Sequence, residues 1–289
     1  MIQNALQLTV SGIAMGFIYA LVAIEYTLVW NSTGLLNFSH DKFIMISAYL
    51  FAGTFILRMN MTPMMGVIMS LLVMFIFGAV VAMTIFNPLR NMSSPIFAVM
   101  GTIVLGRILT ELARIIWGPA PFSLPKFLSG KYKIGNVIIA RANVWIIVVS
   151  LIIVAVMQFF FKATKAGKAM RCVSQNKMAA SLMGIDVTKN IVLTIALSAM
   201  ICTAIGILVI PLFNIDNTMA NMIGLKGFAA GVVGGFGYLP GAIVGGLIIG
   251  ILENISVTVF PAVYKDCVAF VLLIAFLLFK PTGVLGNRK

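Results

Sequence analysis

The chain consists of long apolar runs joined by short polar connections, with one long polar stretch between them. An apolar run of about 20 residues is long enough to cross a bilayer as a helix. Strands of a membrane barrel would instead alternate over about ten residues. We therefore expect an all-α integral membrane protein, a polytopic bundle of about 8–10 transmembrane helices with broken or re-entrant segments. The predicted spans are 6–30, 35–57, 62–86, 94–117, 143–161, 190–212, 239–260 and 264–280, with a weaker ninth at 219–237.

Composition agrees with this class. Of the 289 residues 61% are hydrophobic and only 9% are charged, whereas soluble domains contain about 25% charged residues. The net charge of +13 comes from basic residues beside the apolar runs, which is typical of contact with anionic lipid and not of nucleic-acid binding. The three cysteines lie far apart and there is one histidine, so we expect neither a disulfide nor a metal site. No cleavable signal is evident, and the first helix is expected to be retained.

The long polar stretch is 162–189. It carries six of the 20 Lys and Arg residues and a single acid, Asp186. Because cytoplasmic loops are enriched in Lys and Arg, we place this stretch and the C-terminal tail inside the cell. The proline-rich loop 118–142 is then external. With both 162–189 and the tail inside, the weak segment 219–237 must also cross the membrane.

Within this stretch, helical spacing predicts a short amphipathic helix over 165–176. Lys168, Arg171 and Gln175 share one face of it. A helix of this kind could be a linker lying on lipid head groups, or it could be a docking element for a cytoplasmic partner.

A second short helix is predicted directly after it. Met178, Leu182 and Ile185 repeat at i, i+4 and i+7. Gly184 is placed to end this helix, and Asp186 can cap the next one as it enters the membrane.

Several segments resemble one known family. KAGKAMRCVSQNKMAASLMGIDVTKNIVLTIALSA is similar to the cytoplasmic segment of the permeases of branched-chain amino acid ABC importers, the LivH-like family. GFIYALVAIEYTLVWNSTGLLNFSHDKFIMISAY resembles the first two helices of that family, with its NFAHG element. GLKGFAAGVVGGFGYLPGAIVGGLIIGILE and YKDCVAFVLLIAFLLFKPTGVLG resemble its glycine-rich late helices and its ending. These segments follow the family's order and cover most of the chain.

The resemblance implies a single permease domain, residues 1–289, in the bacterial inner membrane. It also implies a sister permease, two ABC ATPases, and an extracytoplasmic substrate-binding protein. We expect the two permeases to form a heterodimer, and the sequence leaves a homodimer open. ATP and Mg would be used by the ATPases, because this chain has no GxxxxGK[ST] phosphate loop, and we expect no cofactor on the chain itself. By carry-over, the ATPase-coupling residues are Gly167, Ala169, Arg171, Ala179, Gly184 and Ile185.

Glycine rows occupy 224–250 and are interrupted by GFGYLPG at 235–241. Such rows allow close packing of helices, and a broken helix at membrane depth is tolerated where backbone is buried or lines a cavity. We predict that Gly231, Gly235 and Gly241 belong to the translocation path, a gate or a subunit interface. Tight packing alone is the alternative, and Lys226 beside them could simply snorkel.

Ionisable residues inside the apolar runs are costly, so they are expected to face a cavity or each other. We predict that Glu25, Asn37, Ser39, His40 and Asp41 belong to the translocation path or gate. The sequence departs here from the family, which usually has glycine where Glu25 stands and Gly-Glu where Asp41 and Lys42 stand. A compensating pair between Glu25 and Lys42 is conceivable, and a structural role for the single histidine is the alternative.

Three charged residues also follow helical spacing in the run 94–117. Arg107, Glu111 and Arg114 are separated by four and three residues. We expect them to form ion pairs along one helix, near its outer end.

The leading functional hypothesis is the membrane subunit of an ATP-driven importer for leucine, isoleucine or valine. Related permeases carry urea, amides or small carboxylates, so the sequence leaves the solute open. The alternative is a passive channel or a proton-coupled secondary transporter for a small solute, in which Glu25, His40 and Asp41 would relay protons. An intramembrane enzyme is disfavoured, because we find no paired catalytic residues and assign none.

Overall fold

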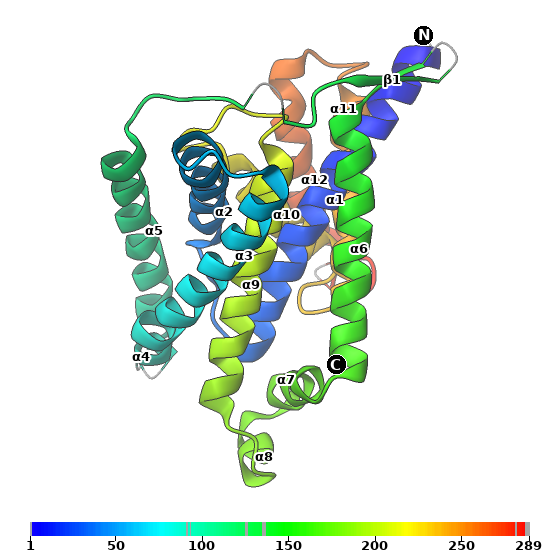
Figure 1. Ribbon diagram of the computed structural model, residues 1–289. Helices are drawn as coiled ribbons and strands as arrows, with labels where there is room; N and C mark the ends of the chain where they lie inside the picture. Colours follow the sequence, from blue (N-terminus) through cyan, green and yellow to red (C-terminus); the bar gives the residue numbers. More distant parts are fainter. Residues whose placement is uncertain are drawn as a thin grey trace. The chain divides into compact units, whose positions relative to one another are not determined.

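The computed structural model describes residues 2–90, 92, 94–124, 127–134, 137–280 and 282–286. These residues are mostly helical, with one antiparallel hairpin in which Lys131 pairs with Ala140. Figure 1 shows the elements in chain order. They are α1 (Ile2–Thr33), α2 (His40–Ala48), η1 (Tyr49–Arg58), α3 (Pro63–Val81), η2 (Ala82–Phe86), α4 (Asn87–Arg90), α5 (Pro95–Trp117), β1 (Lys131–Ile134), β2 (Val137–Ala140), α6 (Arg141–Ala163), α7 (Lys165–Gln175), α8 (Lys177–Leu182), α9 (Val187–Val209), α10 (Asn221–Gly234), α11 (Leu239–Ser256), η3 (Ala262–Tyr264) and α12 (Lys265–Phe279).

Each predicted span corresponds to a helical segment in the described part of the chain. Six of these helices are long and apolar enough to cross a membrane: α1, α3 with its continuation to Leu89, α5, α6, α9 and α11. The shorter segments are α2 with η1, α10 and α12. The weak ninth segment is thus a helix, α10, of 14 residues. The all-α polytopic membrane fold is confirmed.

The chain folds into two compact units that interleave along the sequence. Unit 1 comprises 1–27, 124–154 and 222–289, and unit 2 comprises 28–123 and 155–221. Both α1 and α6 contribute to each unit. That the two units form a single permease domain remains a prediction.

In unit 1, glycines bring α1 and α11 into backbone contact. A Cβ added at Gly250 would lie 2.3 Å from the Cα of Gly16, and one added at Gly246 would lie 2.5 Å from the backbone N of Ala20. Such approach gives close van der Waals contact without a large side chain between the helices. The glycine face of α11 is therefore filled by this chain's own first helix.

In unit 2, α9 packs against α2 and α3 in the same manner. A Cβ at Gly206 would lie 2.5 Å from the carbonyl O of Ile44, and one at Gly78 would lie 2.7 Å from the Cβ of Ala199. Large side chains such as Phe43 and Tyr49 are fully buried around these contacts. This packing fixes α2, which begins with His40, Asp41 and Lys42.

The junction between α1 and α2 is not helical. Gly34 ends α1 with φ of +75° and donates its N–H to the carbonyl of Trp30 at 2.8 Å, the left-handed ending that glycine favours. The six residues 34–39 then lead to α2 (Figure 1). Six extended residues span at most about 20 Å. The second predicted span is therefore a broken helix, irregular at its start and helical from His40.

Candidate translocation and coupling sites

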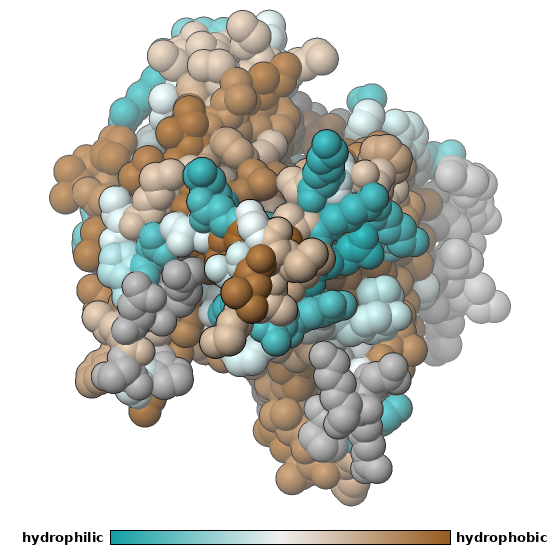
Figure 2. Space-filling model, turned by 90° about the horizontal axis from the view of Figure 1, so that it is seen from below, coloured by the Kyte–Doolittle hydropathy of each residue, from teal (hydrophilic) through white to brown (hydrophobic). Residues whose placement is uncertain are grey.

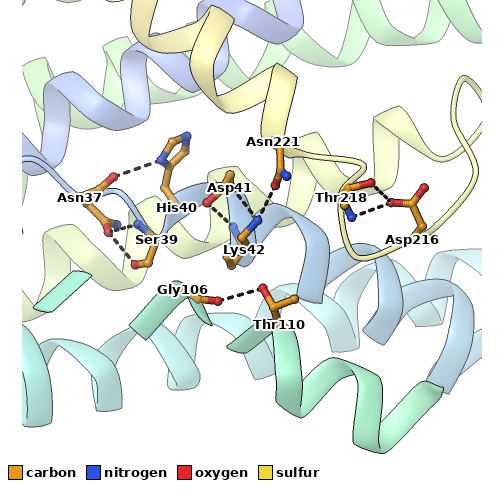
Figure 3. A network of polar contacts seen from close by, with 10 residues as sticks. All are labelled: Asn37, Ser39, His40, Asp41, Lys42, Gly106, Thr110, Asp216, Thr218 and Asn221. Atoms are coloured by element: carbon orange, nitrogen blue, oxygen red, sulfur yellow. Dashed lines mark hydrogen bonds and ion pairs between the residues drawn. The ribbon is translucent and has the colours of Figure 1, made fainter. Parts of the chain in front are cut away.

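Polar side chains close the turn that precedes α2. The carboxamide Oδ1 of Asn37 accepts hydrogen bonds from the backbone N–H of Ser39 at 2.9 Å and from its hydroxyl at 2.6 Å. The ring Nδ1 of His40 lies 3.1 Å from the backbone O of Asn37. Figure 3 shows Asn37 between Ser39 and the ring of His40. All three are almost fully buried, and the hydrogen bonds to Oδ1 and to the backbone O of Asn37 close the turn, whereas Nδ2 of Asn37 has no hydrogen-bond partner among the described residues.

Asp41 and Lys42 extend this group toward α10. The Lys42 ammonium pairs with the Asp41 carboxylate at 2.9 Å and also donates to the carboxamide oxygen of Asn221 (Figure 3). Both charged side chains are about 15% exposed, with values of 14% and 16%. The structure thus brings four of the predicted path residues together in unit 2: Asn37, Ser39, His40 and Asp41.

Glu25 lies in unit 1, on the earlier part of α1, and is fully buried. It therefore belongs to a different unit from the Asn37–Lys42 group. A pair between Glu25 and Lys42 stays a prediction, and the described partners of the Lys42 ammonium are Asp41 and Asn221.

The predicted break in the glycine rows is present. α10 ends at Gly234 and α11 begins at Leu239, with Gly235 at φ of +109° and Gly237 at +91° between them. A Cβ at Gly241 would lie 2.4 Å from the carbonyl O of Gly234, whereas one at Gly231 would have its nearest atom at 3.4 Å. The break is thus a tight turn within unit 1. The assignment of these glycines to the path or gate remains a prediction.

A buried ion group joins three helices of unit 1. The Lys226 ammonium on α10 lies 2.7 Å from Oε1 of Glu253 on α11 and 2.5 Å from Oδ1 of Asp266 on α12. Lys265 completes the group at 3.5 Å from Glu253. The side chains of Lys226 and Glu253 are 5% and 1% exposed. The interpretation of Lys226 as a snorkelling residue is wrong, because its ammonium is buried and paired.

Sequence reasoning missed Glu253 in this group. It stands alone in the apolar run of α11, and an isolated acid in such a run is a signal that a buried cation lies nearby.

The predicted cytoplasmic helices are α7 and α8. Thr164 caps α7 by accepting the N–H of Gly167 at 3.0 Å. A Cβ at Gly167 would lie 2.3 Å from the carbonyl O of Phe160, so glycine is required where α7 folds back on the end of α6. Met170 and Val173 are buried, whereas Lys168 and Arg171 are exposed. The amphipathic assignment is confirmed.

α8 is held by local caps. The carboxamide oxygen of Asn176 accepts the N–H groups of Met178 and Ala179, each at 3.0 Å. Gly184 ends the helix with φ of +81°. Asp186 caps α9 by accepting the N–H of Lys189 at 3.0 Å, and this bond lowers the pKa of its carboxyl below the usual value.

The surface of this element combines basic and apolar side chains. Met178, Leu182 and Met183 are 77%, 83% and 82% exposed. Figure 2 views the molecule from this end and shows hydrophilic side chains, in teal, around a brown and tan group nearest the viewer. Among the predicted coupling residues, Arg171, Ala179 and Gly184 are exposed, Ala169 and Ile185 are half-buried, and Gly167 is buried.

One residue of this element was not predicted to be functional. The ammonium of Lys177 donates to the carbonyl O of Thr33 at 2.6 Å, and Thr33 is the last residue of α1. A cation at a helix C-terminus satisfies a free carbonyl and interacts favourably with the helix dipole. Lys177 therefore links α8 to the broken junction that leads to His40. No sequence pattern separates it from the other lysines of 162–189.

On α5, the predicted ion pairs form in part. Arg114 Nη1 lies 3.2 Å from Oε1 of Glu111, and both side chains are exposed. Arg107 is also exposed, and no described side chain pairs with it. In the described residues, no group of three or more His, Cys, Asp or Glu side chains is arranged to hold a metal ion.

Comparisons with known proteins point to one family. The family model for the branched-chain amino acid transport system permease component matches residues 8–277. The permease LivH of Escherichia coli, described as part of a high-affinity branched-chain amino acid transport system, is 30% identical over 98% of this chain and 96% of its own length. BraD of Pseudomonas aeruginosa, described in the same terms, is 32% identical over 100% of this chain and 98% of its own length.

A solved structure of PsaBC from Streptococcus pneumoniae in complex with Fab has a similar fold. Its TM-score is 0.50 at 13% sequence identity, and the match covers 94% of this chain and 91% of that chain.

Proposed function

Because this chain belongs to the family of permease components of branched-chain amino acid transport systems, we propose that it is the membrane-spanning subunit of an ATP-driven importer for leucine, isoleucine or valine. It is a multi-pass protein of the bacterial plasma membrane. In this proposal a sister permease completes the pathway, two ABC ATPases hydrolyse ATP with Mg, and an external binding protein delivers the amino acid. The chain itself carries no cofactor.

The observation that carries this proposal is the surface of α7 and α8, taken together with the family match. A linker lying on lipid would turn its apolar side chains toward the bilayer core. Here Met170 and Val173 are buried against the protein, while Met178, Leu182 and Met183 are exposed, as is Arg171 on the preceding helix. Exposed apolar side chains rimmed by charge are typical of a protein interface. The proposed occupant is an ATPase subunit.

Lys177 provides a route from that surface to the membrane part. Movement of α8 would carry the Lys177 ammonium, which is bonded to the carbonyl of Thr33. The junction 34–39 joins Thr33 to α2, where Lys42 contacts Asn221. In the proposed cycle, closure of the ATPases moves α8, and the contacts of Lys177 with Thr33 and of Lys42 with Asn221 pass this movement to the membrane helices. The pathway then opens to the other side of the membrane.

The proposed pathway residues contribute few charges. Asn37, Ser39 and His40 form a buried polar turn that is closed by hydrogen bonds to Asn37. This fits a solute with an apolar side chain whose recognition falls mainly to the external binding protein. Asp41 is paired with Lys42, so the pair adds no net charge to the pathway.

Uptake by proteoliposomes that contain the complete transporter tests this function. We expect radiolabelled leucine to accumulate only when ATP is present on the side of the membrane that the ATPase subunits face. Uptake should also require the binding protein and should be abolished by vanadate. A protonophore should have no direct effect. Protonophore-sensitive uptake by this chain without ATPases would refute the proposal and support a secondary transporter.

A further inference from the structure

The outward face of α5 carries charged side chains in the interior of a membrane span. The span runs over Ile96–Trp117. One exposed stripe follows it at intervals of three and four residues, the spacing of a helix–helix contact. The stripe consists of Ile96, Met100, Ile103, Arg107, Glu111 and Arg114.

Arg107 lies halfway along that span. Half of the hydrocarbon thickness is about 15 Å, which is more than an arginine side chain can reach by snorkelling. An arginine facing lipid at this depth costs about 2.5–3.5 kcal/mol even on insertion scales. Glu25 and Glu253, which lie inside other candidate spans, are at most 1% exposed. Among the charged residues inside the described spans, Arg107 on α5 is thus exposed at mid-span, whereas Glu25 and Glu253 are buried.

The other face of α5 is already occupied. The hydroxyl of Thr102 accepts the backbone N–H of Phe38 at 3.2 Å, and a Cβ at Gly106 would lie 3.4 Å from Cγ of Lys42. The face of α5 with Thr102 and Gly106 therefore packs against the polar turn of unit 2. The charged stripe, on the other face, stays exposed within this unit.

From this geometry we infer that a helix of a second, non-identical permease subunit covers the α5 stripe and presents a carboxylate to Arg107. The inference rests on the proposed function for the existence of that subunit. A second copy of this chain, packed by the same stripe about a two-fold axis, would place two Arg107 side chains at the same depth. Glu111 does not offset them, because both of its oxygens are engaged by Arg114 at 3.2 and 3.3 Å.

This contact would also bear on the pathway. A partner on the stripe would contact α5, whose Gly106 faces Ser39 and Lys42: a Cβ added there would lie 3.4 Å from Cγ of Lys42 and 3.7 Å from Cα of Ser39. The subunit interface and the polar turn would then be separated by the thickness of one helix.

Spin labels at two mid-span positions test the occupant of the stripe. The labels are placed at Ile103→Cys and, as a matched control, at Ile76→Cys on α3, which is 62% exposed in a span without charges. The native cysteines are replaced, and the complete transporter is reconstituted in lipid bilayers. We expect position 76 to be accessible to dissolved oxygen, and position 103 to be shielded from both oxygen and a water-soluble nickel chelate.

Three results would overturn the inference. Oxygen accessibility at position 103 equal to that at position 76 would mean a lipid-facing stripe. Accessibility to the nickel chelate would mean a water-filled path. A disulfide between two Ile103→Cys copies of this chain would mean a homodimer.

The charge requirement is tested by Arg107→Leu, with Arg114→Leu near the outer end as its control. We expect Arg107→Leu to reduce recovery of the co-expressed sister permease at least tenfold and Arg114→Leu to reduce it far less. Normal recovery with Arg107→Leu would contradict the inference. If the ATPases still co-purify and drive uptake in that case, the proposed function stands although the interface is wrong.

Discussion

The ion group of unit 1 and two arginines of unit 2 differ in whether their charge is neutralised by described side chains. In unit 1, Lys226, Glu253 and Asp266 are drawn into one ion group by three helices, and the ammonium and one carboxylate are buried. In unit 2, Arg107 on α5 and Arg171 on α7 are exposed, and no described side chain pairs with either. The ion group is satisfied within the chain, whereas Arg107 and Arg171 lie on surfaces where other subunits are proposed to bind.

The apolar residues show the same contrast. The glycines of α11 are in contact with α1 and α10 inside unit 1, although glycine rows in membrane helices are often read as subunit interfaces. Met178, Leu182 and Met183 in unit 2 lie in α8 or directly after it and are more than three-quarters exposed. Residue type alone therefore does not separate packing surfaces from docking surfaces, and burial does.

Removal of the central cation from the unit 1 ion group should give the largest effect. Lys226→Leu leaves Glu253 buried without its nearest partner, which typically costs about 3–5 kcal/mol. We expect a much lower unfolding temperature and a reduced yield in detergent. Size-exclusion chromatography of heated samples measures the unfolding temperature. The double variant Lys226→Leu/Glu253→Leu should recover part of the loss. A single variant as stable as the unmodified chain would show that the ion group does not hold α10, α11 and α12 together.

Charge reversal on α7 should be the next largest effect, on binding and not on stability. Arg171→Glu is expected to weaken binding of the ATPase subunits about thirtyfold, since it places an acid where a basic contact is proposed. Co-purification and uptake would both fall, while membrane insertion stays normal. Arg141→Glu, a charge reversal at an exposed residue directly after the β1–β2 hairpin, is the control. Full uptake with Arg171→Glu would argue against this residue as a coupling contact.

Two glycine substitutions in unit 1 compare the stability cost of a Cβ at a tightly packed position with that at a loosely packed one. Gly241→Ala should destabilise the chain by about 1–3 kcal/mol, because its Cβ would overlap the carbonyl of Gly234. Gly231→Ala should be nearly neutral, since its Cβ meets atoms only at ordinary contact distance. Thermal unfolding of both variants provides the comparison. Equal stability of the two would mean that the α10–α11 turn relaxes easily.

Loss of the Lys177 contact should give the smallest effect. Lys177→Met removes the charge-assisted bond to Thr33 and should lower the rate of uptake about tenfold, because such bonds contribute about 1.5 kcal/mol. ATPase binding should be unchanged. Lys165→Met, at an exposed lysine of α7, is the control. If the two variants transport at the same rate, α8 does not act on α1 through this contact.

Much of the fold follows from local sequence signals. The apolar runs predicted every membrane segment, and the capping roles of Gly184 and Asp186 followed from their residue types. The tertiary contacts could not be predicted in the same way. The pairing of Lys226 with Glu253 and Asp266 joins residues 27 and 40 positions apart, and the bond from Lys177 to Thr33 joins residues 144 positions apart. Helical periodicity carries no information about such separations.

The reactivity of Cys172 tests the proposed docking surface most directly. This thiol lies on α7 next to Arg171 and is exposed, and Cys202 is buried. A Cys267→Ser variant therefore leaves Cys172 as the one exposed cysteine of the three. The rate of maleimide labelling is measured for the permease pair alone and for the complete transporter with its ATPases. The proposed docking predicts at least a tenfold slower reaction in the complete transporter, and an unchanged rate would contradict it.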